Sequence, residues 1–225
     1  MVEAFGNALP FAVAVALSPF PIIAVVLVLL SPTGKSAGLA FLAGRVAGVA
    51  VIVGVFAAIS DLVERSGEAS PAVAAARVLV GAALVVLAVW KRPGRSPTET
   101  ERETASELPG WMSALEGASS GRAARVAFLL SVANPKELLL GVGAGITIGS
   151  SGLPLGATLG VAAAYTVVAC LSVAVPVVAF LAAPDRIRGR LEALRALLVR
   201  HNAAIISVLL LVIGAALIGG GLSEL

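Results

Sequence analysis

The sequence predicts an all-α membrane protein, in which six transmembrane helices form a 3+3 inverted repeat and helices 1 and 4 are broken. Three observations predict this class. The 225 residues are 59% hydrophobic and 13% charged, whereas soluble domains are roughly 45–50% apolar and about 25% charged. Six segments are long and apolar enough for a span of about 20 residues. Two proline motifs at corresponding places in the two halves each predict an interrupted helix.

The six apolar segments follow one another along the whole chain. They are Ala8–Leu30, Ala37–Ser60, Ala72–Trp90, Ala123–Gly149, Leu153–Ala183 and Ala203–Leu222. The first follows a start, "MVEAFGNALPF", without the basic residues of a secretory signal, so we expect a retained span. The fifth is long and contains Pro176, so we expect it to bend or tilt.

Lysine and arginine in the loops predict the orientation. The loops expected on one side carry Lys35, Lys91, Arg92, Arg95, Arg102, Arg122, Arg186, Arg188, Arg190, Arg195 and Arg200. The opposite loops carry Arg65, beside three acidic residues. Because positively charged loops stay in the cytoplasm, we expect both chain ends outside a multi-pass plasma-membrane protein.

A polar connector divides the chain into two halves. Residues 91–121 are rich in Thr, Glu, Ser, Pro and Gly, which indicates a flexible cytoplasmic linker. It separates a first three-helix repeat, 1–90, from a second, 122–225. Within the second, residues 184–200 alternate leucines with arginines at helical spacing, which predicts an amphipathic helix in the membrane interface. Contact with anionic lipid and a plain positive-inside anchor are both open for that helix.

The fourth segment contains the motif "SVANPKELLL", which predicts that a helix starts again inside the membrane. Asn134 suits an N-cap, Pro135 the first helical position, and Glu137 the third position of a capping box. A restart requires a stop just before it, so we expect the fourth span to be discontinuous.

The first segment repeats this device in "ALSPFPIIAV". Ser18 is the expected cap, Pro19 the first helical residue, and Pro21 is tolerated only in a first turn. Interrupted helices in oppositely oriented halves are typical of inverted-repeat transporters with a site near the midplane. Two half-helix N-termini, each worth about half a positive charge, would converge there and favour an anion. Prolines that merely kink two continuous helices are the alternative.

Charged residues inside the apolar segments point to the same place. Arg45 lies well inside the second segment, and Lys136 and Glu137 lie at the break in the fourth. Each charge at such depth costs about 2.5–3.5 kcal/mol, so we expect these side chains to face an interior. One interpretation is an anion site that includes Arg45 and Lys136; the other is an Arg45–Glu137 pair that holds two spans together. The predicted substrate-binding residues are Ser18, Pro19, Pro21, Arg45, Asn134, Pro135, Lys136 and Glu137.

Glycine pairs predict how the helices pack, and the scarcity of cysteine and histidine limits the chemistry of the protein. Gly44 with Gly48, and Gly141 with Gly145, are small-xxx-small pairs that predict close helix packing. With one cysteine, Cys170, and one histidine, His201, we expect no metal centre, no cofactor and no disulfide. We expect neither a nucleic-acid partner nor an enzyme, because no binding module and no nucleophile–base set is present.

At these motifs the sequence resembles the glycolipid-addressing (GAP) proteins of the lysine-exporter (LysE) superfamily. The resemblance rests on "LPFAVAVALSPFPIIAVVLVLLSP", "GLAFLAGRVAG" and "SVANPKELLL", and the six-span pattern extends it over the chain. It implies movement of envelope lipids or lipid-linked saccharides across the plasma membrane. Amino-acid exporters of the superfamily usually have Pro-Gly-Pro where this chain has Ser-Pro-Phe-Pro, which disfavours lysine-like substrates.

Three functions stay open at this stage. The favoured one is secondary transport of an anionic lipid or glycolipid whose acidic head group binds at the midplane. The others are an exporter of small solutes such as amino acids, and a non-transporting membrane partner of a lipid synthesis or export complex. A thiol-electron conductor would need two cysteines and is excluded by the single one. The expected partners are the bilayer and an acidic lipid, and a homodimer is open.

Overall fold

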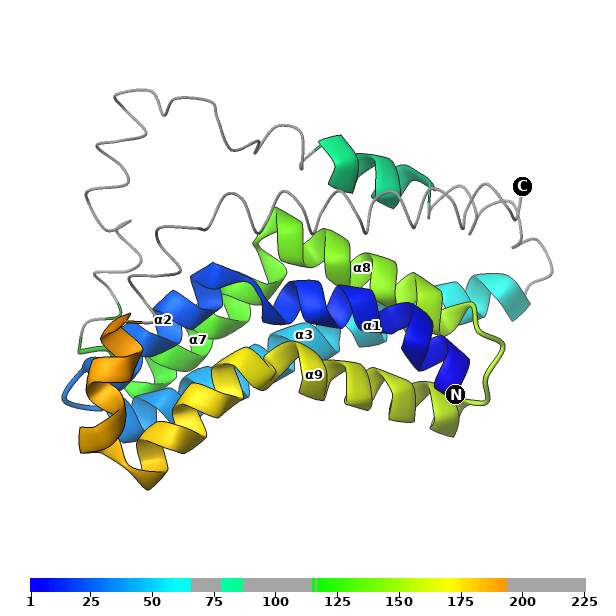
Figure 1. Ribbon diagram of the computed structural model, residues 1–225. Coiled ribbons are helices and arrows are strands. Elements are labelled where there is room, and N and C mark those ends of the chain that lie inside the picture. The colour runs from blue at the N-terminus through cyan, green and yellow to red at the C-terminus, as the bar shows by residue number, and fades with distance from the viewer. Residues whose placement is uncertain (66–77, 87–114, 116, 194–225) are drawn as a thin grey trace.

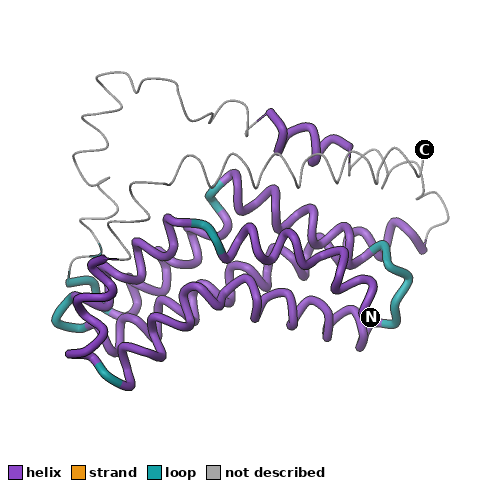
Figure 2. The backbone as a smooth tube through the Cα atoms, viewed as in Figure 1, coloured by secondary structure: helices purple, strands orange, loops and turns teal. Residues whose placement is uncertain are grey.

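The computed structural model describes residues 1–65, 78–86, 115 and 117–193, which form helices joined by short turns (Figures 1 and 2). The main elements are α1 (Val2–Ala16), α2 (Pro19–Leu30), α3 (Gly34–Arg65), α7 (Ser120–Val132), α8 (Pro135–Gly149) and α9 (Leu155–Ala182). Residues 78–86 and 184–193 are also helical. None of the described residues forms a strand, so the all-α prediction is confirmed for this part of the chain.

Four of the predicted spans lie in the described part. α3 and α9 are each long and apolar enough to cross a membrane, over Gly34–Val63 and Leu155–Ala182, and α9 continues through Pro176. The α1–α2 and α7–α8 pairs each add a span if the bent pair is counted as one. The third predicted span is described only over 78–86, and the sixth, 203–222, lies outside the described residues. Six spans in a 3+3 repeat therefore stay a prediction.

Both predicted breaks are confirmed. The axis turns by 51° between α1 and α2 and by 67° between α7 and α8. Ser18 and Asn134, which precede the first prolines, have extended backbone, with ψ of 118° and 113°. The proline ring disfavours helical geometry in the residue before it, so the helix stops and starts again. Two continuous, kinked helices are thereby excluded.

The two broken spans run in opposite directions. α1 packs against α8, and α2 packs against α7. Figure 1 shows α2 and α7 at one end of the molecule and α1 and α8 at the other. This antiparallel arrangement is the one expected if the two halves enter the membrane from opposite sides. Each restarted helix, α2 or α8, thus begins at the level of the breaks and runs away from it.

Glycines allow α3 to lie close against both parts of the second broken span. A Cβ on Gly44 would collide with the carbonyl oxygen of Ala124 in α7, and one on Gly145 of α8 would lie 2.7 Å from Cβ of Phe56. A Cβ would also lie too close to the neighbouring helix at three further glycines along these two contacts: Gly48, Gly141 and Gly149. The predicted small-residue packing is confirmed, and Gly149 extends it by one turn.

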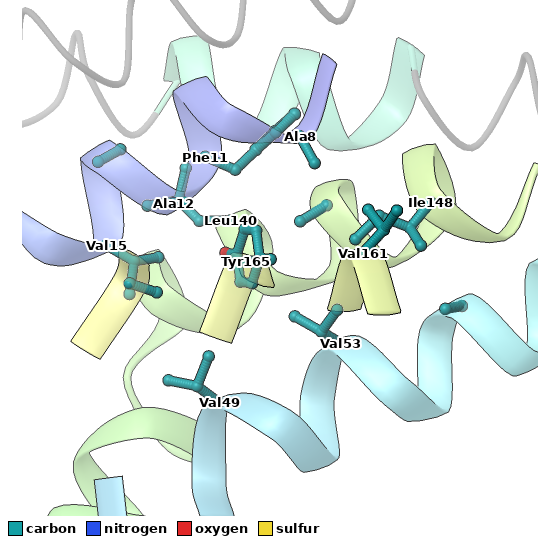
Figure 3. Close-up of a cluster of buried hydrophobic side chains, with 14 of the residues drawn as sticks. Ala8, Phe11, Ala12, Val15, Val49, Val53, Leu140, Ile148, Val161 and Tyr165 are labelled. Carbon is teal, nitrogen blue, oxygen red and sulfur yellow. The ribbon is translucent and has the colours of Figure 1, made fainter. Parts of the chain in front are cut away.

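The buried apolar residues form two cores that meet at the breaks. The first core joins α1, α8, the second part of α3 and the first part of α9, and includes Phe11, Val15, Val49, Val53, Leu140, Ile148, Val161 and Tyr165 (Figure 3). The second core joins α2, α7 and the other parts of α3 and α9, and includes Val25, Leu29, Phe41, Ala123, Ala127, Val173 and Val177. Five of the buried polar residues lie where the chain passes from one core to the other, and we call these five the polar layer. It consists of Ser18, Arg45, Ser131, Lys136 and Glu137.

The second core ends at a positively charged end of the molecule. The hydroxyl of Thr33 donates to the carbonyl oxygen of Ala118 at 3.1 Å and ties the start of α3 to that of α7. The helix at 184–193 packs Ile187 and Leu191 on the second core, so its apolar face rests on protein. Six cations at this end are exposed: Lys35, Arg122, Arg125, Arg186, Arg188 and Arg190. The rest of the predicted amphipathic helix, 194–200, lies outside the described residues.

Candidate functional site

Arg45 is the centre of the polar layer. It lies on α3 and is 1% exposed. Its Nη1 atom donates to Oε2 of Glu137, on α8, in a salt bridge, and to Oγ of Ser131, on α7, at 2.8 Å. One guanidinium therefore holds both sides of the break in the fourth span. The interpretation of Arg45 and Glu137 as a pair that joins two spans is confirmed.

The start of α8 follows the predicted motif in part. Asn134 is the N-cap, and its side chain accepts from the backbone N–H of Lys136 at 3.2 Å. Glu137 does not complete the predicted capping box, because one carboxylate oxygen accepts from Arg45 and the other, Oε1, has no hydrogen-bond partner among the described residues. A buried carboxylate gains more from a charged donor than from a neutral N–H. Pro135, in the first position, is exposed.

The start of α2 differs from the prediction. Ser18 is the N-cap and is fully buried, but its hydroxyl caps no backbone N–H and has no partner in the described part of the chain. An N-cap side chain accepts from the second or third N–H of its helix. Pro21 occupies the third position and has no N–H, which leaves the N–H of Phe20 alone. Ser18 is thus the N-cap residue as predicted, but its side chain makes no capping hydrogen bond. In its first turn α2 has few backbone N–H groups that could donate to a ligand in the polar layer.

Lys136 adds a second buried cation to the layer. It is 3% exposed at the second position of α8, beside Glu137 at 3%. The buried charged residues of the described part are thus Arg45, Lys136 and Glu137. Taken together, these three side chains carry more positive than negative charge.

A small cavity lies between the two broken spans and the helices α3 and α9. Its volume is about 10 Å³, and its lining is Val15, Val49, Ile52, Ser131, Glu137, Gly141 and Tyr165. Val15 lies in the last turn of α1, before the first break, and Ser131 and Glu137 flank the second, so both broken spans line this cavity. A volume of this size holds about one water molecule. It does not hold a lipid head group in this conformation.

Tyr165 brings a hydroxyl into the first core. The side chain is fully buried among apolar residues of α1, α3 and α8 (Figure 3). Its hydroxyl has no hydrogen-bond partner among the described residues, which is also true of Oε1 of Glu137. Both residues line the small cavity. Buried polar groups are normally satisfied, and a cavity of this size can hold one water molecule that binds to both oxygens.

The structure places the eight predicted site residues at the starts of two helices. Asn134, Pro135, Lys136, Glu137 and Arg45 gather at the start of α8, and Ser18, Pro19 and Pro21 form the start of α2. The sequence interpretation missed Ser131 and Tyr165. Ser131 opens the motif that predicts the break, and Tyr165 is the single tyrosine of the chain. Either fact could have marked the residue as a candidate for the site. Neither fact predicts a contact with another helix.

A wider hollow lies at the start of α7. Its volume is about 520 Å³, and its lining includes Gly117, Ser119, Arg122, Arg125 and Val126. Ser119 is the N-cap of α7 and makes no side-chain capping bond. Small-molecule pockets commonly measure about 300–1,000 Å³. This hollow therefore has space for a polar group that the inner cavity lacks.

Two interrupted spans that meet at a buried ionic layer between two apolar cores define a class: helical membrane proteins built around broken helices. The family described as "Sap, sulfolipid-1-addressing protein" matches residues 8–223, and the chain belongs to this family. The predicted relationship to glycolipid-addressing proteins is thereby confirmed, whereas the wider lysine-exporter relationship stays a prediction. No curated protein and no solved structure matches the chain.

Proposed function

We propose that this protein is a secondary transporter that moves an anionic glycolipid across the plasma membrane, with the acidic head group passing through the polar layer at Arg45 and Lys136. One observation carries the proposal: both broken spans line the same small cavity, Val15 from the last turn of α1 and Ser131 and Glu137 from the two sides of the second break. Helices broken at membrane depth are tolerated where they line a site or a path, not where they face lipid.

The family name supports an acidic substrate. A sulfolipid carries a sulfate or sulfonate group, and both are negatively charged at every physiological pH. The planar guanidinium of Arg45 fits the oxygens of a sulfate or phosphate, and the ammonium group of Lys136 supplies a second positive charge. The N-termini of α2 and α8 add positive dipole ends.

Transport requires the two cores to separate, because the inner cavity of about 10 Å³ is too small for a head group. The breaks offer hinges for this motion. α1 and α8 belong to the first core, and α2 and α7 to the second. Rocking of one core against the other would open the polar layer to one face of the membrane at a time, as in other inverted-repeat carriers.

The hollow at the start of α7 supplies an entry point in this proposal. Arg122 and Arg125 line it, and it opens at the positively charged end of the molecule. Basic pockets between helices on the cytoplasmic side attract anionic head groups. A head group would bind here first and then pass to the polar layer while the acyl chains stay in lipid.

The experiment is a leaflet-exchange assay with the purified protein in vesicles. Sulfatide, a sulfated galactosyl lipid, and galactosylceramide, the same lipid without sulfate, are each fluorescently labelled and followed by one-sided quenching. We expect sulfatide to exchange faster than galactosylceramide, and Arg122→Gln with Arg125→Gln to slow its entry. Equal exchange of both lipids would contradict an acidic-head-group site. Transport of lysine without lipid exchange would favour the small-solute exporter.

A further inference from the structure

We infer that Glu137 is a proton-binding site that is exchanged against the substrate: in the empty protein its carboxylate occupies Arg45, and when an acidic head group takes that place Glu137 takes up one proton. This inference rests on the proposed function, because it names Arg45 as the head-group ligand. Glu137 binds the proton, and the proton is then the coupling ion of the transport step.

The salt bridge itself suggests the exchange. Arg45 is 1% exposed, and Glu137 is its one carboxylate partner among the described residues. A sulfate or phosphate that pairs with Arg45 competes with Glu137 for the positive charge of the guanidinium, whose Nη1 donates to Glu137 and Ser131 and whose Nε has no partner among the described residues. Two anions on one buried guanidinium would repel each other at low dielectric, so binding of the head group displaces the carboxylate.

Once Glu137 is protonated, a hydrogen-bond acceptor for its O–H lies nearby. An ionised carboxylate that loses its arginine partner inside the protein is costly, and the group becomes neutral unless it pairs with Lys136, which lies beside it. A neutral carboxyl needs an acceptor for its O–H. The Tyr165 hydroxyl oxygen, which has no partner among the described residues, lines the same water-sized cavity as Glu137. The O–H of Glu137 therefore donates to Tyr165, directly or through one water molecule.

The balance of charge is simple. The Arg45–Glu137 pair opens, the head-group anion pairs with Arg45, and the Glu137 carboxylate combines with one proton from the aqueous side that admits the substrate. The net charge of the layer is the same before and after. The other titratable and charged groups around Glu137 are Lys136 on α8 and Tyr165 and Cys170 on α9. α1 and α7 contribute Val15 and Ser131 to the cavity, which do not titrate in this range.

Lys136 defines the competing outcome. If the head group bound to Lys136 alone, the Arg45–Glu137 pair would stay closed and no proton would be taken up. Proton uptake on binding therefore separates the two arrangements, and binding alone does not.

The test is calorimetric titration of the full-length protein with short-chain sulfatide in buffers of different ionisation enthalpy. We expect about one proton taken up for each sulfatide bound, so that Kd rises by up to about tenfold for each pH unit. Glu137→Gln should remove both the uptake and the pH dependence, and should bind more tightly than wild type at high pH because nothing competes for Arg45. Infrared difference spectra of the wild-type protein, which need no variant, should show a protonated carboxyl appearing on binding.

The failures are distinguishable. Sulfatide binding without proton uptake and without the carboxyl band would overturn this inference and leave the proposed function intact. Absence of sulfatide binding at every pH would overturn both. Proton uptake that persists in Glu137→Gln would show that another group titrates and would also overturn the assignment.

Discussion

Arg45 and Glu137 form a salt bridge that is buried on every side and lies where the fourth span is interrupted. The two residues are 92 positions apart in the sequence. The pair neutralises the most costly charge in the interior of α3 and fixes the start of α8. Because the same arginine also binds Ser131, before the break, it acts as a clamp across both parts of the broken helix.

Removing one partner of this clamp should destabilise the protein strongly. Loss of one member of a buried ion pair leaves an uncompensated charge and costs about 3–5 kcal/mol. We expect Glu137→Gln to lower the free energy of unfolding by about this amount, measured by thermal or denaturant unfolding in detergent. The double variant Arg45→Gln, Glu137→Gln removes both charges and should recover most of the loss. A double variant as unstable as the sum of the two single variants would contradict the clamp.

Close packing between α3 and α8 predicts a large effect from a single methyl group. In Gly145→Ala the new Cβ would lie 2.7 Å from Cβ of Phe56 and 3.0 Å from the carbonyl oxygen of Val53. We expect a loss of about 1–3 kcal/mol, which is typical of overpacking. Gly156→Ala, in the first turn of α9, is the matched control, because nothing lies within 4 Å of its Cβ. Equal melting temperatures for the two variants would contradict the packing.

Because the Ser18 side chain makes no capping bond, we expect substitutions at Ser18 and Pro21 to have non-additive effects on the free energy of unfolding. Pro21→Ala restores an N–H at the third position of α2, which the Ser18 hydroxyl can then accept from. Ser18→Ala should therefore cost about 1 kcal/mol more in the Pro21→Ala background than in the wild type. Unfolding of the four proteins of this double-mutant cycle measures the difference. A cycle that closes additively would show that the proline does not prevent the cap.

The orientation of the two halves can be tested outside the described residues. In a Cys170→Ala background, single cysteines replace Ser106, in the predicted cytoplasmic linker, and Ser223, near the C-terminus. Because three spans separate these positions in the predicted topology, a membrane-impermeant thiol reagent should label them from opposite sides. Labelling of both from the same side would rule out the inverted repeat.

Local rules explain what the sequence predicted well. A proline fixes the first helical position and makes the preceding residue extended, so Pro19 and Pro135 predict both breaks without any knowledge of the neighbours. The depth of Arg45 and Glu137 in apolar segments also predicts that they face the interior. Glycine spacing predicts the close contacts of α3, because a helix brings every fourth residue to one face.

Contacts between helices explain what the sequence could not predict. Ser18 is the N-cap residue but makes no side-chain capping bond, because Pro21 has no N–H. Glu137 does not form a capping box, because Arg45, on another helix, binds its carboxylate. The roles of Ser131 and Tyr165 depend on the approach of α7 and α9 to α3, which has no local signature. Which carboxylate meets which arginine is a tertiary property.

Lys136 gives the most direct test of an anion path through the polar layer. Leaflet exchange of labelled sulfatide should be abolished in Lys136→Ala, with folded protein still abundant, and partly retained in Lys136→Arg, which keeps the charge but alters its geometry. Lys35→Ala, an exposed lysine on α3, is the matched control and should exchange sulfatide as the wild type does. Normal sulfatide exchange by Lys136→Ala would contradict an anion path through the polar layer.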